Sequence, residues 1–242
     1  MFSKKIKFTA PKNYLKLKEN YPKPIKFNLP DWYKNLKHKV DFKTVKGCMP
    51  FLETMVSGYV LELPQDLHIK HNVQDGEKRI SALIPSLPES HGININTTEK
   101  KDDHPNSQLG DSPLNEKNLS FPFYKILNPW KIETPKGYSC LFVPPLNNAD
   151  DRFSIIPGIV QTDKFDHEIN FPFTINGDKY PVLDTLFKKG TPYVQIIPFK
   201  RESWKMDVDA QDENKNSIIR LKYKLNVLNN YRKQHWEKIN FK

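Results

Sequence analysis

From position 134 the chain reads Thr134-Pro-Lys-Gly-Tyr-Ser-Cys-Leu-Phe-Val-Pro-Pro-Leu-Asn147, and three similar runs follow before Arg201. These runs are Ile156-Pro-Gly-Ile-Val-Gln-Thr-Asp163, Ile169-Asn-Phe-Pro-Phe173 and Gly190-Thr-Pro-Tyr-Val-Gln-Ile-Ile-Pro-Phe199. Each is rich in β-branched and aromatic residues and is bounded by proline or glycine, which is typical of short strands joined by tight turns. Gly137, Gly158 and Gly190 are expected where a turn needs a positive φ or a close backbone approach. The stretch predicts a β core around which the rest of the chain is arranged.

Composition supports one mainly β unit with a basic surface. The 242 residues are enough to bury a core, and 20 prolines against nine glycines argue against long helices through the middle. The formal net charge of +10 comes mostly from lysine. Such a balance favours polyanions, but a solvated lysine surface explains it as well. Because the basic residues are spread widely and form no arginine cluster, nucleic-acid binding is expected to be non-specific at most.

The cysteines and the N-terminus bear on the cellular setting. Cys48 and Cys140 have no metal-type spacing and lie in apolar runs, so we expect buried free thiols in a reducing compartment. Residues 1–5 are not followed by the apolar region of a signal peptide. No stretch approaches the length that spans a bilayer, so no membrane association is predicted.

Three regions are expected along the chain: a basic N-terminal arm (1–45), a β core (46–210) and a C-terminal amphipathic helix (211–242). In the arm, Lys5–Thr9 alternates like an edge strand, and Asp31 is a candidate cap for a short helix over Trp32–Leu36. We expect the arm to pack on the core through its aromatic residues, with nucleic-acid binding as the alternative.

The first half of the core is predicted as one helix followed by strands. A short buried helix is expected within Thr44–Val56, with Pro50 in its first turn and Ser57-Gly58 ending it. Strands are expected at Tyr59–Leu63, Asp66–Lys70 and Lys78–Pro85, with a hairpin turn at Gln74–Gly76. Between about 88 and 118 apolar residues become sparse, which indicates a polar insert on the surface.

The C-terminal region carries an apolar stripe. Trp204–Val208 is expected as a last strand. Beyond it, Ile218, Leu221, Leu225, Leu228 and Tyr231 follow the spacing of one face of a helix of about twenty residues. The stripe could dock on its own domain or on another subunit or partner, and both possibilities stay open.

Residues that could carry chemistry are few. His68 and His71 would point to opposite faces of a strand, so they are poor co-ligands. His91, Asp102, Asp103 and His104 lie in the polar insert and could bind a metal only if that loop folds for it. The best local cluster is Asp163, Asp166 and His167, in a turn after a strand, where catalytic groups often lie. A polar turn explains this cluster equally well.

Four segments resemble, in order, the signature motifs of the trimeric dUTPase and dCTP-deaminase superfamily. They are Ser57-Gly-Tyr-Val-Leu-Glu-Leu-Pro-Gln-Asp-Leu-His-Ile69, Pro135-Lys-Gly-Tyr-Ser-Cys-Leu-Phe-Val-Pro-Pro145, Gly158-Ile-Val-Gln-Thr-Asp163 and Gly190-Thr-Pro-Tyr-Val-Gln-Ile-Ile197. They cover about a third of the chain. The resemblance implies a β-clip, which is a twisted barrel-like β fold, here with short N-terminal helices and a C-terminal helix. It also implies a homotrimer, with Phe165, Gln195 and Gly190 at positions that bind ligand.

The chain departs from that superfamily at the positions that perform its chemistry. The aspartate that activates the attacking water in the third motif corresponds to Gln161, and an amide is no general base. The aspartate of the first motif corresponds to Val60. The phosphate-contacting Arg-Ser pair falls near Pro145 and Leu146, which offer no side-chain donor. The scaffold positions match and the chemical positions do not, which is the pattern expected of a fold used for shape.

Further segments resemble proteins of tailed phages and some bacteria that have no assigned activity. They are Asp31-Trp-Tyr-Lys34, Cys48-Met-Pro-Phe51, Asn128-Pro-Trp130, Ile169-Asn-Phe-Pro-Phe173 and Phe199-Lys-Arg-Glu-Ser-Trp204. We therefore expect a non-catalytic binding or assembly protein, located in the host cytoplasm or incorporated in the virion, that self-associates or binds protein partners. No metal or cofactor is expected. The alternative is a divergent nucleotide hydrolase that uses Asp163 or Asp166 with Mg²⁺, and non-specific nucleic-acid binding is a third class.

Overall fold

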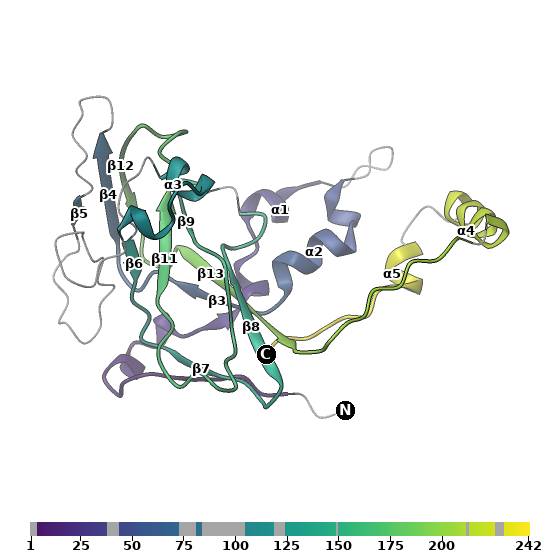
Figure 1. Cartoon of the computed structure of the whole chain (residues 1–242), viewed down its shortest axis with the longest axis horizontal. Coiled ribbons are helices and arrows are strands. Elements are labelled where there is room, and N and C mark those ends of the chain that lie inside the picture. The colour runs from purple at the N-terminus through teal and green to yellow at the C-terminus, as the bar shows by residue number, and fades with distance from the viewer. Residues whose placement is uncertain are drawn as a thin grey trace.

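Strand β13 (Pro192–Lys200) is the nine-residue strand at the centre of the largest sheet (Figure 1). The computed structural model describes residues 4–37, 44–72, 81–83, 105–118, 124–148, 150–211, 213–225 and 230–242. In that sheet the strands lie in the order β10-β8-β13-β3-β2, and all neighbours are antiparallel. Their bounds are Gly158–Val160 for β10, Tyr138–Val143 for β8, Tyr59–Glu62 for β3 and Lys23–Pro24 for β2.

Three smaller antiparallel sheets surround this one. The first is β6-β11-β9, made of Tyr124–Ile126, Phe171–Ile175 and Phe153–Ile155. The second is β12-β4-β5, made of Val182–Phe187, Leu67–Asn72 and Ser81–Leu83. The third pairs β1 (Lys7–Thr9) with β7 (Lys131–Glu133). The predicted mainly β fold is confirmed. In each sheet the first and last strands are not paired with each other, so the described residues form no closed barrel.

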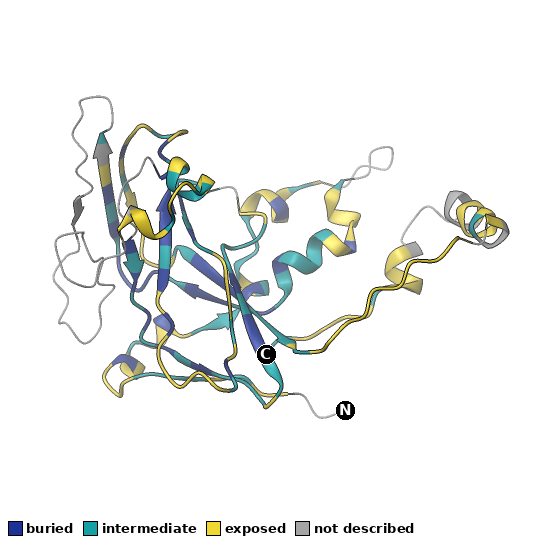
Figure 2. Cartoon of the chain, in the orientation of Figure 1, coloured by how far each residue is buried: buried dark blue, intermediate teal, exposed yellow. Residues whose placement is uncertain are grey.

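Aromatic side chains join the sheets into one core. Figure 2 shows the buried residues on the strands of these sheets in dark blue. Phe142 of β8 lies 5.5 Å from Phe171 of β11, ring centre to ring centre, and Phe171 meets Tyr193 of β13 edge-on. Phe187 of β12, in the second of the smaller sheets, contacts Phe153 of β9, in the first, at 4.7 Å. Apolar burial of such rings is the main stabilising term for a core of this kind. It explains why the runs quoted first from the sequence form the centre of the fold.

The described part of the N-terminal arm packs on this core. Tyr14 is buried and its ring lies edge-on to Trp130 at 5.5 Å. Helix α1 (Asp31–Asn35) follows Pro30, and no side chain caps it. The expected cap by Asp31 is wrong, because Asp31 is the first helical residue and its carboxylate pairs with Lys34. Tyr33 is the residue that α1 buries, whereas Trp32 is largely exposed.

Helix α2 (Met49–Val56) has Pro50 in its first turn, as predicted. It ends at Ser57, and Gly58 has a φ of +85° where the chain turns into β3. Cys48 precedes the helix and is exposed, which corrects the expected burial, since its apolar neighbours Met49 and Met55 occupy the inner face instead. Cys140 is buried, and that burial raises the pKa of its thiol to about 11.

Two turn glycines behave as predicted and one does not. Gly137 and Gly190 have φ values of +84° and +85°, a region that favours glycine. Gly158 lies inside strand β10 with ordinary backbone, and nothing lies within 4 Å of where a Cβ would be. Ile156 and Pro157, not Gly158, separate β9 from β10.

Most of the polar insert lies outside the described residues, and so does the predicted turn at Gln74–Gly76. Of the strand predicted at Lys78–Pro85, only Ser81–Leu83 is described, and it forms β5. His91, Asp102, Asp103 and His104 are also outside them. The described end of the insert forms helix α3 (Pro113–Lys117), capped by Ser112. The buried Asn118 then accepts a hydrogen bond from the backbone N–H of Ile175 at 2.8 Å, so this end of the insert is attached to β11.

After β13 the chain leaves the core as a C-terminal extension, residues 202–242 (Figure 1). Its first part, 202–211, is extended but joins no sheet, so the expected last strand at Trp204–Val208 is absent from the described structure. Helices α4 (Glu213–Leu225) and α5 (Asn230–Gln234) follow within the predicted helical region, and residues 226–229 between them lie outside the described residues. The last residues run back to the core, where Phe241 packs edge-on against Tyr59 at 5.8 Å.

Candidate functional site

The predicted cluster at Asp163 is divided between the interior and the surface. The backbone N–H groups of Lys164 and Phe165 donate to the Gln161 carbonyl at 2.8 and 2.9 Å, which closes a tight turn. Asp163 points inward from this turn, with 3% of its side chain exposed. Asp166 points outward and pairs with Lys131, and the exposed Phe165 ring lies edge-on to His167.

Asp163 is held by two groups from other parts of the chain. Arg201, the residue after β13, donates through both terminal nitrogens, with 2.6 Å from one of them to Oδ1. The N–H of Gly137 donates to Oδ2 at 2.8 Å. The guanidinium of Arg201 lowers the pKa of Asp163 to about 2. A carboxylate with so low a pKa and with both oxygens occupied is a weak proton acceptor at neutral pH.

A polar pocket of about 270 Å³ lies beside this turn. It is lined by Lys131, Glu133, Thr134, Thr162, Asp163, Lys164, Phe165 and Asp166. Each carboxylate of this lining is paired with a cation: Asp163 with Arg201, Asp166 with Lys131, and Glu133 with Lys7 and Lys131. Within the described residues, no three His, Cys, Asp or Glu side chains come together as a metal site.

Gln195 and Gly190 have structural roles. Gln195 is fully buried, and its amide nitrogen donates to the carbonyls of Thr54 and Ser57, both at 2.8 Å. Its amide oxygen accepts from the N–H of Leu146 at 3.0 Å. The residue therefore fastens α2 to the loop after β8 from the central strand. Gly190 lies in the turn before β13, and its N–H donates to the carbonyl of Leu63 at 2.8 Å. These hydrogen bonds occupy the Gln195 amide and the Gly190 N–H.

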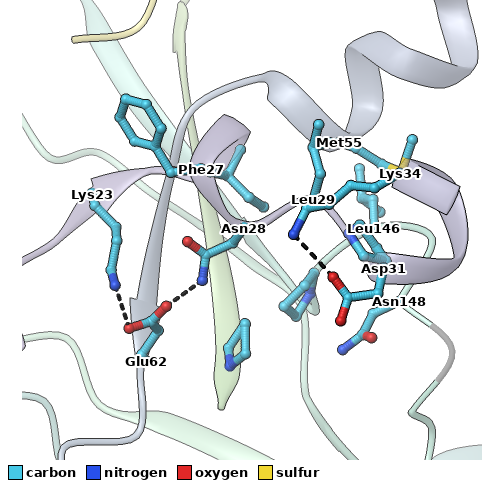
Figure 3. Close-up of a pocket in the computed structure, with 14 residues that line it drawn as sticks. Lys23, Phe27, Asn28, Leu29, Asp31, Lys34, Met55, Glu62, Leu146 and Asn148 are labelled. Carbon is cyan, nitrogen blue, oxygen red and sulfur yellow. Dashed lines mark hydrogen bonds and ion pairs between the residues drawn. The ribbon is translucent and has the colours of Figure 1, made fainter. Parts of the chain in front are cut away.

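A groove that the sequence did not indicate runs between the N-terminal arm, α2 and the loop after β8 (Figure 3). Its volume is about 490 Å³. On one side Glu62 lies between Lys23 and Asn28 and binds both, with 2.7 Å to the Lys23 nitrogen. On the other side Lys34 pairs with Asp31. In the sequence, the one hint of this groove is Glu62, an acid within the apolar run Tyr59–Leu63. Its partners, Asn28 and Lys23, precede it by 34 and 39 positions.

Side chains of the groove suit binding rather than reaction. Ile25, Leu29, Met55 and Leu146 give it apolar walls, and its charged groups neutralise one another. The residues that line the groove include no Ser, Thr, Cys, His or Tyr, and its two carboxylates, Asp31 and Glu62, are ion-paired. The lysines, Lys23 and Lys34, are both ion-paired.

A third cavity, of about 690 Å³, is strongly basic. It is lined by Lys4, Lys5, Ile6, Lys7, Phe8, Tyr59, Asn240 and Lys242. Lys7 is paired with Glu133. This groove brings residues 4–8 beside residues 240–242, and its lysines would attract a polyanion.

The C-terminal extension carries the most exposed large apolar side chains in the described part of the protein. Trp204, Met206 and Val208 are 88%, 85% and 81% exposed. In α4, Ile218, Ile219 and Leu221 are also exposed (Figure 2). Leu225 and Leu228, the other leucines of the predicted stripe, belong to residues whose side chains are not described. The stripe does not dock on its own core in the part that can be seen.

The extension is fixed at both of its ends. At the start, Arg201 donates its N–H to the Gly137 carbonyl at 2.8 Å and pairs with Asp163. At the end, Lys26 donates to the Phe241 carbonyl at 2.7 Å and Tyr59 donates to the Lys242 carbonyl at 3.3 Å. An apolar surface held away from the core on two anchors is the strongest candidate for a functional site.

Comparison with models of protein families and with curated proteins found no match to this chain. The resemblance to the dUTPase superfamily therefore stays a prediction from the four motifs. Of the helices in the described residues, none combines the length and the apolar run that crossing a bilayer requires.

Proposed function

We propose that this protein is a non-catalytic, self-associating assembly protein whose C-terminal extension makes the contact between copies. The observation that carries this proposal is the exposure of Trp204, Met206 and Val208 on an extension that projects from the core. Burying a large apolar side chain contributes about 1.5–3 kcal/mol, so three such residues strongly favour a covered state. Large exposed apolar patches on soluble proteins mark interaction sites.

The rest of the molecule supports a binding role over a catalytic one. Asp163 and Asp166 are ion-paired, Gln195 is committed to the backbone of α2, and Gln161 replaces the expected base. The motif order further favours a β-clip scaffold, a fold whose relatives usually form trimers. The phage-type segments favour a role in virion assembly. The alternative of a Mg²⁺-dependent nucleotide hydrolase relies on Asp163 and Asp166, and both are engaged by cations.

The test is the molar mass in solution, measured by light scattering on the full chain and on two variants. Trp204→Ser/Met206→Ser/Val208→Ser should lower the mass to that of one copy while leaving the thermal melting of the core unchanged, since these side chains touch nothing in the core. A matched control, Phe27→Ser/Val182→Ser, removes two exposed apolar residues elsewhere and should keep the mass of the full chain.

Deleting residues 202–242, which removes the whole extension, should have the same effect on mass and should leave the β core folded. It also removes Phe241 from Tyr59, so a modest drop in melting temperature is expected from that loss alone. A full-length protein that is monomeric at high concentration would refute the proposal.

A further inference from the structure

The extended part of the C-terminal extension, residues 202–211, has a backbone with no partner in the described structure. Its only hydrogen-bonded N–H groups belong to Val208 and Ala210, and each bonds the aspartate side chain just before it. The strand that leads into it is also open. β13 pairs with β3 only as far as Ile196, so from Ile197 to Lys200 one edge of β13 has no neighbouring strand. Unpaired extended backbone of this kind is a template for another strand.

The side chains of this segment alternate as in a strand. Successive side chains of a strand face opposite ways, so paired as a strand this segment would place Trp204, Met206 and Val208 on one side and Lys205 and Asp207 on the other. The apolar side is the one that needs a cover, and the polar side carries one charge of each sign.

We infer that residues 203–209 of two copies pair as an antiparallel two-stranded ribbon centred on Met206. This inference rests on the proposed self-association and names its geometry. In that register Met206 lies opposite Met206 of the second copy, and Trp204 lies opposite Val208. On the other face Lys205 lies opposite Asp207 of the second copy, and this happens twice because the arrangement is two-fold symmetric. Each face of the segment therefore meets the same face of the second copy with matching apolar or oppositely charged side chains.

Neighbouring registers are worse. Centring the ribbon on Lys205 or on Asp207 brings two like charges directly opposite each other, which is destabilising. Centring it on Val208 places Asp207 opposite Asp209 of the second copy. Centring it on Trp204 brings Glu202 opposite Met206. Charge and apolarity thus select one register, and because each copy uses the same patch, the contact closes with two chains.

The test reverses the charges. Lys205→Asp alone places two carboxylates opposite each other, and Asp207→Lys alone places two ammonium groups opposite each other. Each single variant should weaken dimerisation by about tenfold or more, measured as the dilution midpoint of the molar mass. The double variant Lys205→Asp/Asp207→Lys exchanges the charges and should restore dimerisation to within about threefold of the unmodified chain.

Cross-linking checks the centre of the ribbon. In a Cys48→Ser background, which removes the exposed native thiol, Met206→Cys should form a disulfide-linked dimer under mild oxidation. The matched control Lys205→Cys faces residue 207 of the second copy and should cross-link at least several-fold more slowly. The ribbon is overturned if the dimer is unaffected by the charge reversals and does not cross-link at residue 206, or if three copies assemble. Either result leaves the proposed self-association standing. A monomeric full chain overturns both.

Discussion

Arg201 closes over the buried carboxylate of Asp163 at the point where the C-terminal extension leaves β13, with 2.6 Å between the guanidinium and Oδ1. The pair joins the end of the central strand to the turn after β10, and Gly137 adds a third contact from the turn before β8. One carboxylate thus fixes three segments that the sequence separates by up to 64 positions.

This ion pair should make part of the protein's stability dependent on pH. Because the pKa of Asp163 is about 2 in the fold and close to 3.9 when unfolded, its contribution is present above about pH 4 and is lost as the pH falls through about 2. Asp163→Asn should therefore lower the melting temperature at pH 7, and the difference from the unmodified chain should disappear near pH 2. Thermal melts between pH 2 and 7 measure this. Asp166→Asn is the control, and an equal loss in both variants would show that the burial of Asp163 does not matter.

Hydrolysis of nucleoside triphosphates should be absent. With Gln161 at the expected position of the base and Asp163 bound by Arg201, no described carboxylate in the adjacent pocket is free to activate water. Release of phosphate or pyrophosphate from dUTP, dCTP and related triphosphates with Mg²⁺ should not exceed the background without protein. Turnover that vanishes in Asp166→Asn, a variant expected to fold normally, would restore the hydrolase alternative.

Two glycines with the same φ should respond differently to substitution. At Gly190 a methyl group meets nothing within 4 Å, so Gly190→Ala should cost only the strain of a positive φ, about 1–2 kcal/mol. At Gly58 a Cβ would lie 2.0 Å from the Ile196 carbonyl oxygen, in the middle of the central strand. Gly58→Ala should be clearly more destabilising than Gly190→Ala in urea unfolding. Equal losses would mean that β13 can shift away from Gly58 without cost.

Binding to DNA should be weak and should depend steeply on salt. The basic groove at Lys4, Lys5 and Lys242 attracts phosphates but contains no arginine for reading bases. Affinity should fall by orders of magnitude between about 0.05 and 0.2 M salt, and Lys4→Ala/Lys5→Ala should reduce the slope of log affinity against log salt by about 2. Fluorescence anisotropy with two unrelated duplexes measures both quantities. Binding that distinguishes the duplexes and survives about 0.2 M salt would contradict a purely electrostatic interaction.

The sequence predicted the strands best where local signals coincide. Around Tyr138–Val143 and Pro192–Lys200, β-branched and aromatic residues are bounded by Pro or Gly, and both segments are strands. Trp204–Val208 shows the same alternation but has no neighbouring strand, because a strand also needs a partner that sequence spacing does not supply. The predicted burial of Cys48 was wrong for a similar reason: the sequence shows that the residue lies in an apolar run, but not which side of that run faces the core.

Site residues were harder to predict than strands. Asp163 was correctly placed in a turn, but its partner Arg201 is 38 positions away and nothing local connects them. Gln195 was singled out through a motif, yet its amide bonds are made to backbone groups about 140 positions earlier. The groove around Glu62 depends on Lys23 and Asn28 reaching it from the N-terminal arm. Tertiary partners of polar residues decide their role, and one sequence carries little information about them.

The two anchors of the extension also determine how the molecule would carry mechanical load. The outgoing chain is continuous with β13, and the returning chain is held at Tyr59, whose strand β3 is the direct neighbour of β13. A pull on the tip of the extension would act along β13, parallel to its ladders with β8 and β3. Strands loaded in that direction must break many hydrogen bonds together rather than one after another. The attachment of the extension to the core should therefore resist a pulling force well, because the force loads the hydrogen bonds of β13 in shear.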